Sequence, residues 1–201
     1  MKSDICALSA NDIESLKKVF SETEKTAVYA ALDKKQSGRL RLLAEELVEM
    51  LPSLLAFTAG EFWIDCNGKN FELHTTLTPN DSLTSEKRDE LLKVSFSGKN
   101  AAATGIMAKI RLAATFMLID YEKNAAEMPA TTDFYQDGMG TNPYFPISSW
   151  SLENYRIKAK DEQGEKWDEL EKSIIANIAD DVLVGVEGKK VEIIVKKSFQ
   201  P

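Results

Sequence analysis

Hydrophobic positions follow a helical period in one long segment early in the chain, between Arg39 and Phe57. Leucines and Met50 recur there at intervals of three and four residues, which places them on one face of a helix. Pro52 lies inside this segment. Because proline lacks a backbone donor and clashes with the preceding turn, it is expected to kink the helix or end it one turn early.

Two shorter helices are expected before this segment. Ser9 or Asn11 can cap the first. Its apolar face consists of Ile13, Leu16, Val19 and Phe20. The second is expected to begin at residues 21–24, Ser-Glu-Thr-Glu, which match a capping box. Residues 34–38 are expected to break the helical pattern before the long helix begins.

Two later segments alternate between apolar and polar residues and predict hairpins. Residues 61–66 and 71–77 flank Asn67-Gly68. Asn-Gly between alternating segments is a strong hairpin signal, because both central residues of that turn take positive φ. Runs rich in β-branched residues between 182 and 195 flank a second turn, Glu-Gly-Lys. The two turns resemble each other in sequence, which predicts two hairpins of one antiparallel sheet.

The middle of the chain predicts one buried helix and one irregular segment. Small and apolar residues from 101 to 121 indicate a helix that is buried on more than one side. Prolines, glycines and aromatic rings mark 122–165 as an irregular, aromatic-rich insertion. The rings between 134 and 155 are expected to hold this segment against the body. A helix at 167–178 follows, and the whole chain, 1–201, is expected to form a single domain.

This order of elements favours an α+β two-layer sandwich, in which an antiparallel or mixed sheet carries helices on one face. The prediction has a topological test. The first and last hairpins should lie in one sheet, and the helices at 39–57 and 101–121 should cover one of its faces.

The composition narrows the range of partners. The formal net charge of -7 disfavours nucleic acid and anionic membranes as main partners. The two cysteines do not form a disulfide framework and are expected to be reduced thiols. The N-terminal apolar stretch is too short for a signal peptide, and no stretch approaches the length of a membrane span. The expected location is therefore the cytoplasm.

The element order is similar to that of the histidine-kinase-like ATPase superfamily, which includes sensor-kinase catalytic domains and gyrase-type ATPases. The nearest resemblance is to the small bacterial anti-sigma serine kinases. It covers residues 10–120 and 165–198 by element order. In that family a helix carrying a Glu and an Asn precedes a hairpin, and a glycine-bearing lid leads into a second helix. Here residues 42–50, Leu-Leu-Ala-Glu-Glu-Leu-Val-Glu-Met, resemble the first motif helix.

The resemblance implies ATP and magnesium as ligands and assigns roles to named residues. Glu45 or Glu46 takes the position of the catalytic glutamate. The magnesium-binding Asn, four residues further on, is replaced by Glu49 or Met50. Magnesium prefers hard oxygen ligands, so the Met50 thioether is a poor partner, whereas the Glu49 carboxylate would be chemically acceptable. Because neither residue is the Asn of the family, no metal site is assigned.

The remaining motifs of the family are partial here. Asp81 follows the first hairpin at the position of the family's adenine-reading Asp, without the motif's glycines. Gly98, Lys99 and Gly105 stand for the glycine-bearing lid. Together with Glu49 and Asp81 they form the nucleotide-binding set that the resemblance implies.

Several of these residues also have plain structural interpretations. The glutamates of the motif helix fit a solvated face opposite the leucines. His74 is the only histidine, and it is expected on the surface, on the strand face away from Phe71 and Leu73. Asp180 and Asp181 fit a helix end before a strand.

Three hypotheses follow from these patterns. The first is a regulatory protein-interaction domain on an ATPase-like scaffold with nucleotide binding reduced or lost; a homodimer is left open. The second is an active ATP-dependent serine kinase of the anti-sigma type. The third is an unrelated α+β binding domain.

Overall fold

The computed structural model describes residues 1–9, 13–54, 57–80, 106, 109, 110, 113–115, 117, 118, 150–162, 170, 173–187 and 189–200. In this part of the chain six strands form one antiparallel sheet in the order β1-β2-β3-β6-β5-β4. The strands are β1 (Cys6–Leu8), β2 (Phe57–Asn67), β3 (Asn70–Pro79), β4 (Trp150–Ser151), β5 (Asp181–Glu187) and β6 (Lys190–Ser198).

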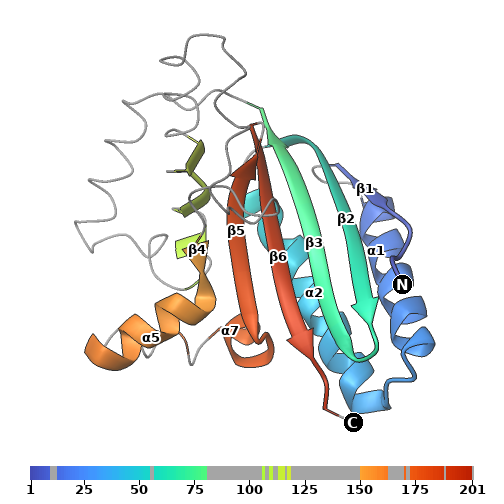
Figure 1. Ribbon diagram of the computed structural model, residues 1–201. Coiled ribbons are helices and arrows are strands. Elements are labelled where there is room, and N and C mark those ends of the chain that lie inside the picture. Colours follow the sequence, from blue (N-terminus) through green and yellow to red (C-terminus); the bar gives the residue numbers. More distant parts are fainter. Residues whose placement is uncertain are drawn as a thin grey trace, which may run out of the picture.

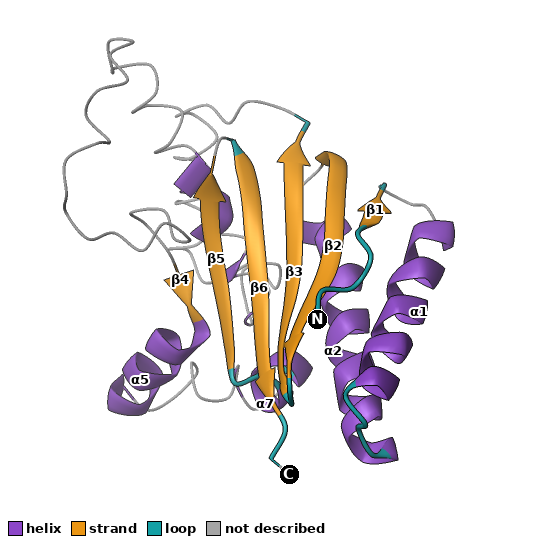
Figure 2. Cartoon of the chain, turned by 45° about the vertical axis from the view of Figure 1, so that its right-hand side comes forward, coloured by secondary structure: helices purple, strands orange, loops and turns teal. Residues whose placement is uncertain are grey.

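The helices gather on one face of this sheet. Figure 1 shows α2 (Lys34–Leu54) behind the long strands, and Figures 1 and 2 show α1 (Ile13–Tyr29) next to α2 at the β1 side of the sheet. The short helix α7 (Ile174–Ile178) packs against α2, and α5 (Leu152–Glu162) lies beside the β4 edge. The α+β arrangement with helices layered on an antiparallel sheet is therefore confirmed.

The pairing of β3 with β6 joins the two hairpins, as the sequence predicts. Thr75 opposes Ile193, and Leu73 opposes Val195. Because β3 and β6 are antiparallel, the two hairpin tips lie at opposite ends of the sheet.

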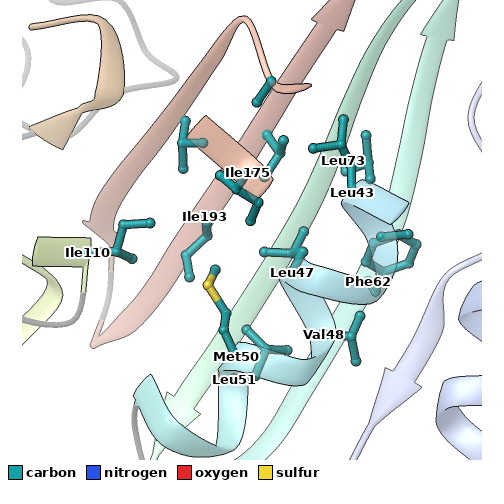
Figure 3. Packing of buried hydrophobic residues seen from close by; sticks show 14 of the residues in the cluster. Leu43, Leu47, Val48, Met50, Leu51, Phe62, Leu73, Ile110, Ile175 and Ile193 are labelled. Atoms are coloured by element: carbon teal, nitrogen blue, oxygen red, sulfur yellow. The ribbon is translucent and has the colours of Figure 1, made fainter. Parts of the chain in front are cut away.

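The core lies between α2 and the middle strands. Figure 3 shows Leu47 and Met50 of α2 among side chains from β6 and from the helical residue Ile110. Ile106, Ile110, Ala114 and Leu118 are all buried at four-residue spacing. This spacing is that of one helix face, which agrees with a helix in the described part of the segment 101–121. Burial on more than one side stays a prediction.

The first two expected helices are one helix, α1, which runs through residues 21–24 without a break. The hydroxyls of Thr23 and Thr26 donate to the carbonyls four residues earlier, at 2.8 Å each, so neither side chain caps a new helix. The expected capping box at residues 21–24 is wrong. Threonines inside a helix satisfy their hydroxyls on the preceding turn.

The capping box lies instead at the start of α2. Asp33 Oδ1 accepts from the backbone N–H of Gln36 at 2.7 Å, and Gln36 Oε1 accepts from the N–H of Asp33 at 3.3 Å. Residues 34–38, expected to break the pattern, are the first turns of α2. The helix ends at Leu54, two residues after Pro52 and before the strand residue Phe57, as the proline predicts.

The first hairpin turn is shifted by one residue from the predicted position. Asn67 pairs with Asn70 and is the last residue of β2, so the central residues are Gly68 and Lys69. Gly68 has φ +62°, and a glycine at positive φ in the first central position is the requirement of a type II′ turn.

Other expectations also change. β1 pairs with β2 at the sheet edge, in a stretch for which no strand was expected. Ser173 caps α7 by accepting from Ala176, so the expected helix 167–178 is not continuous. Inside the segment 122–165, residues 150–162 form β4 and α5, and residues 122–149 lie outside the described residues. Arg156 of α5 donates to the carbonyls of Ala179 and Asp180, which holds this segment to the turn before β5.

Candidate functional site

The glutamates of the motif helix lie on the outer side of α2. Glu45 accepts from Arg41 Nε at 2.9 Å, and Arg41 also pairs with Glu24 of α1. Glu49 is exposed. Glu45 therefore belongs to a surface ion network between α1 and α2, which fits the solvated-face interpretation.

Glu46, like Glu45, is half-buried, whereas Glu49 is exposed. Burial raises the pKa of the Glu46 carboxyl above its ordinary value, and the charges of Glu49 and Glu45 add to this. A carboxylate with a raised pKa is the kind of group that enzymes use as a general base. Glu46 therefore combines partial burial with a raised pKa.

Met50 stands one helical turn beyond Glu46, where the resemblance expects the magnesium-binding Asn. Only 5% of Met50 is exposed, and it belongs to the hydrophobic core with Leu47 and Leu51. Figure 3 shows its thioether directed into that core. This position offers an apolar surrounding instead of a hard oxygen ligand.

The other residues of the implied nucleotide site, Asp81, Gly98, Lys99 and Gly105, lie outside the described residues. The structure thus brings together Glu45, Glu46 and Glu49 on one helix.

Asp180 and Asp181 serve the fold, as expected. Asp180 accepts from the backbone N–H of Ser198 at 2.5 Å and from Lys197 Nζ at 2.7 Å. Asp181 Oδ1 accepts from the backbone N–H groups of Glu153 and Val182. Both carboxylates hold neighbouring elements to the start of β5.

The face of the sheet opposite α1 and α2, called the open face below, carries a polar cluster around His74. The His74 ring stacks on Trp63, with centroids 4.8 Å apart and planes at 7°. Its Nδ1 lies 3.4 Å from Glu192 Oε1. Its Nε2 lies 3.5 Å from carboxylate oxygens of both Asp65 and Glu72.

His74 is 9% exposed, so the expected surface histidine is wrong, although the strand face was predicted correctly. Among the described residues its Nε2 has no hydrogen-bond partner. Trp63 Nε1 donates to Asp65 Oδ2 at 3.1 Å, which holds the indole and this carboxylate together.

The shifted turn explains why the sequence does not reveal this cluster. With Asn67 and Gly68 as central residues, Trp63 would oppose Glu72. With Gly68 and Lys69 in the turn, Trp63 opposes His74. Residues directly opposite in an antiparallel pair lie about 4.5–5.5 Å apart at Cβ, so the correct register places one ring over the other. The alternation of residues 61–77 is the signal that could have found the stack, once the turn was placed.

The described residues contain no group of three or more His, Cys, Asp or Glu side chains arranged to hold a metal ion. Cys6 and Cys66 are free and buried, and burial raises the pKa of both thiols. In the part of the chain that the structure describes, no helix has the length and apolar character needed to cross a membrane.

Comparison of the chain with protein-family models, with curated proteins and with solved structures finds no match.

Proposed function

We propose that this chain is a regulatory protein-interaction domain on a histidine-kinase-like ATPase scaffold, with nucleotide binding reduced or lost. The observation that carries the proposal is the burial of Met50 in the core, at the position where the resemblance expects a magnesium ligand. A thioether in an apolar surrounding cannot replace the amide oxygen of Asn toward magnesium.

The element order supports the scaffold part of the proposal. An early hairpin, β2–β3, and a last hairpin, β5–β6, lie side by side in one sheet, and α2 packs across its back. The pairing of Glu45 with Arg41 supports the loss of a catalytic role at Glu45, and the exposed position of Glu49 supports the loss of its nucleotide-binding role.

Calorimetric titration of the whole chain with ATP and magnesium tests the proposal. No heat of binding at micromolar ATP, and no ATP-dependent thermal shift, are expected. Micromolar binding accompanied by ATP turnover would overturn the proposal.

A second candidate, an active serine kinase of the anti-sigma type, is favoured by one observation. Glu46 is partly buried with a raised pKa, which suits a general base for a serine hydroxyl. If ATP turnover is found, Glu46→Ala should abolish it, and Glu45→Ala should leave most of it. Equal turnover in both variants would remove Glu46 from the mechanism.

A further inference from the structure

The open face of the sheet has an apolar and aromatic centre. One row of paired residues crosses four strands from β2 to β5 and consists of Trp63, His74, Ile194 and Leu183. Neighbouring strands lie about 4.8 Å apart, so this row spans about 14 Å. Ile194 is only 7% exposed, yet it stands outside the core cluster beneath the helices.

Carboxylates border this central row on both sides. The row on one side consists of Asp65, Glu72, Lys196 and Asp181; the row on the other consists of Glu61, Thr76, Glu192 and Gly185. Five of these eight positions are acidic and one is basic. Five of the 32 Asp and Glu residues of the chain therefore border this central row on one face of the sheet.

Two lysines of the chain itself place ammonium groups on this surface. Lys2 Nζ lies 4.5 Å from the centre of the Trp63 ring, in a cation–π contact. Lys196 Nζ lies 3.2 Å from Glu72 Oε1. An ammonium group therefore already occupies the indole face, and another already pairs with a carboxylate of the border.

His74 provides an independent observation. It is more than nine-tenths buried, and its Nε2 points between Asp65 and Glu72 without a hydrogen-bond partner among the described residues. A buried polar atom without a partner is costly. A cation docked on Asp65 and Glu72 would fix both carboxylates, and a shift of a few tenths of an ångström would let one of them accept from the imidazole.

We infer that the open face is a docking surface for a basic protein segment with an apolar stripe flanked by lysines or arginines. The inference deepens the proposed interaction function and rests on it. A second copy of the chain would bring five carboxylates against five, and nucleic acid would bring phosphates, so like charges oppose both occupants. A basic segment is complementary to the centre and to both borders.

A synthetic Leu/Lys peptide with leucines at helical spacing is the probe, and its Leu/Glu counterpart is the negative control. With Trp150 and Trp167 replaced by Phe in the whole chain, the remaining indole fluorescence reports on Trp63. The Leu/Lys peptide is expected to change this fluorescence, and Trp63→Ala is expected to weaken binding, measured by calorimetry, by about tenfold or more.

Two matched pairs of charge reversals distinguish binding at the open face from general electrostatic attraction of the peptide to the chain. Asp65→Lys with Glu72→Lys should reduce affinity by about tenfold or more. Glu14→Lys with Glu153→Lys makes the same charge change at exposed positions on helices and should reduce it by less than about threefold. If the first pair does not fold, by far-UV circular dichroism, Asp65→Asn with Glu72→Gln replaces it, with the same direction expected.

Equal losses from the two pairs, equal binding of the Leu/Glu peptide or no change in Trp63 fluorescence would overturn the inference. So would a dimer, seen by sedimentation, that Trp63→Ala dissociates, because the occupant would then be a second copy. If the chain binds neither the peptide nor ATP, only the docking surface is ruled out. Tight ATP binding with turnover would rule out the proposed function itself.

Discussion

His74 lies flat against Trp63, 4.8 Å between ring centroids, on the face of the sheet opposite α1 and α2. The contact joins adjacent strands β2 and β3, and it shields an imidazole whose Nε2 lacks a hydrogen bond among the described residues. The contacts of His74 thus have two parts: the stacked ring area, and the polar contact of Nδ1 with Glu192 Oε1, 3.4 Å away.

Replacing His74 separates these two parts. His74→Ala should lower the free energy of unfolding by about 1–2 kcal/mol, because the stack and its buried area are lost. His74→Phe keeps a ring against Trp63 and removes the unpaired nitrogen, so it should cost less than the alanine variant. Urea unfolding of both variants checks the order, and equal losses would show that stacking is not what matters.

Thr75, the next residue along β3, faces the core and is fully buried, and its hydroxyl has no hydrogen-bond partner among the described residues. Thr75→Val keeps the shape and removes this hydroxyl, so it should raise the free energy of unfolding by about 1 kcal/mol. Thr76→Val, on the open face, is the control and should stay within about 0.5 kcal/mol of the parent. A loss at Thr75, measured by urea unfolding, would mean that the hydroxyl has a partner.

Two glycines should respond to alanine in opposite directions. A Cβ on Gly60 would lie 2.9 Å from Leu77 Cδ2 and 3.0 Å from the carbonyl oxygen of Thr76, whereas one on Gly38 would meet nothing within 4 Å. Gly60→Ala should cost about 1–3 kcal/mol through overpacking. Gly38→Ala, inside α2, should gain about 0.5–1 kcal/mol through helix propensity. Thermal unfolding of both variants checks the signs, and a stabilised Gly60→Ala would contradict this packing.

Periodicity was enough to predict the four central strands of the sheet, but not β1 or β4. The alternating segments around residues 61–77 and 182–195 are hairpins, and their predicted pairing is the contact between β3 and β6. The leucine spacing likewise predicted α2 and its buried face. These signals are strong because burial of one face imposes a period on many residues at once.

Local turn and cap chemistry was predicted less well, because single polar residues have several uses. Residues 21–24 could begin a helix or continue one, and Thr23 donates to the carbonyl of Val19 inside α1. Asn67 could be a central residue of the turn or the last residue of the strand, and it is the last residue of β2. That one-residue shift determines which residue lies opposite Trp63. The sequence pattern therefore predicted the strand face of His74 but not the cluster around it.

The position of the true capping box can be tested directly. Asp33→Ala removes the acceptor for Gln36 N–H at the start of α2 and should cost about 1 kcal/mol. Ser21→Ala, inside α1, removes a residue that the sequence alone marks as a cap, and it should be neutral or slightly stabilising. Urea unfolding of the two variants decides between the positions. A larger loss for Ser21→Ala would mean that α1 has a cap at its middle.

Glu46 should make stability depend on pH. Burial first, and then Glu49 and Glu45, raise the pKa of its carboxyl in the folded chain above the ordinary value of 4.5. The folded state then holds the proton more tightly than the unfolded chain does. Its contribution to stability is complete below the ordinary value and is lost as the pH rises through the raised pKa.

The side chain introduced by Glu46→Gln cannot ionise, so this variant should not lose stability as the pH rises. At pH 7 it should be more stable than the parent, by about 0.5 kcal/mol or less because the side chain is only partly buried, and the difference should vanish near pH 4. Glu45→Gln is the control on the same helix. It removes the charged partner of Arg41 and should instead cost a few tenths of a kcal/mol at pH 7, roughly the strength of an exposed helix ion pair. Urea unfolding at both pH values measures the two differences. A gain from Glu46→Gln that persists unchanged at pH 4 would show that packing, and not the charge of Glu46, is the cause.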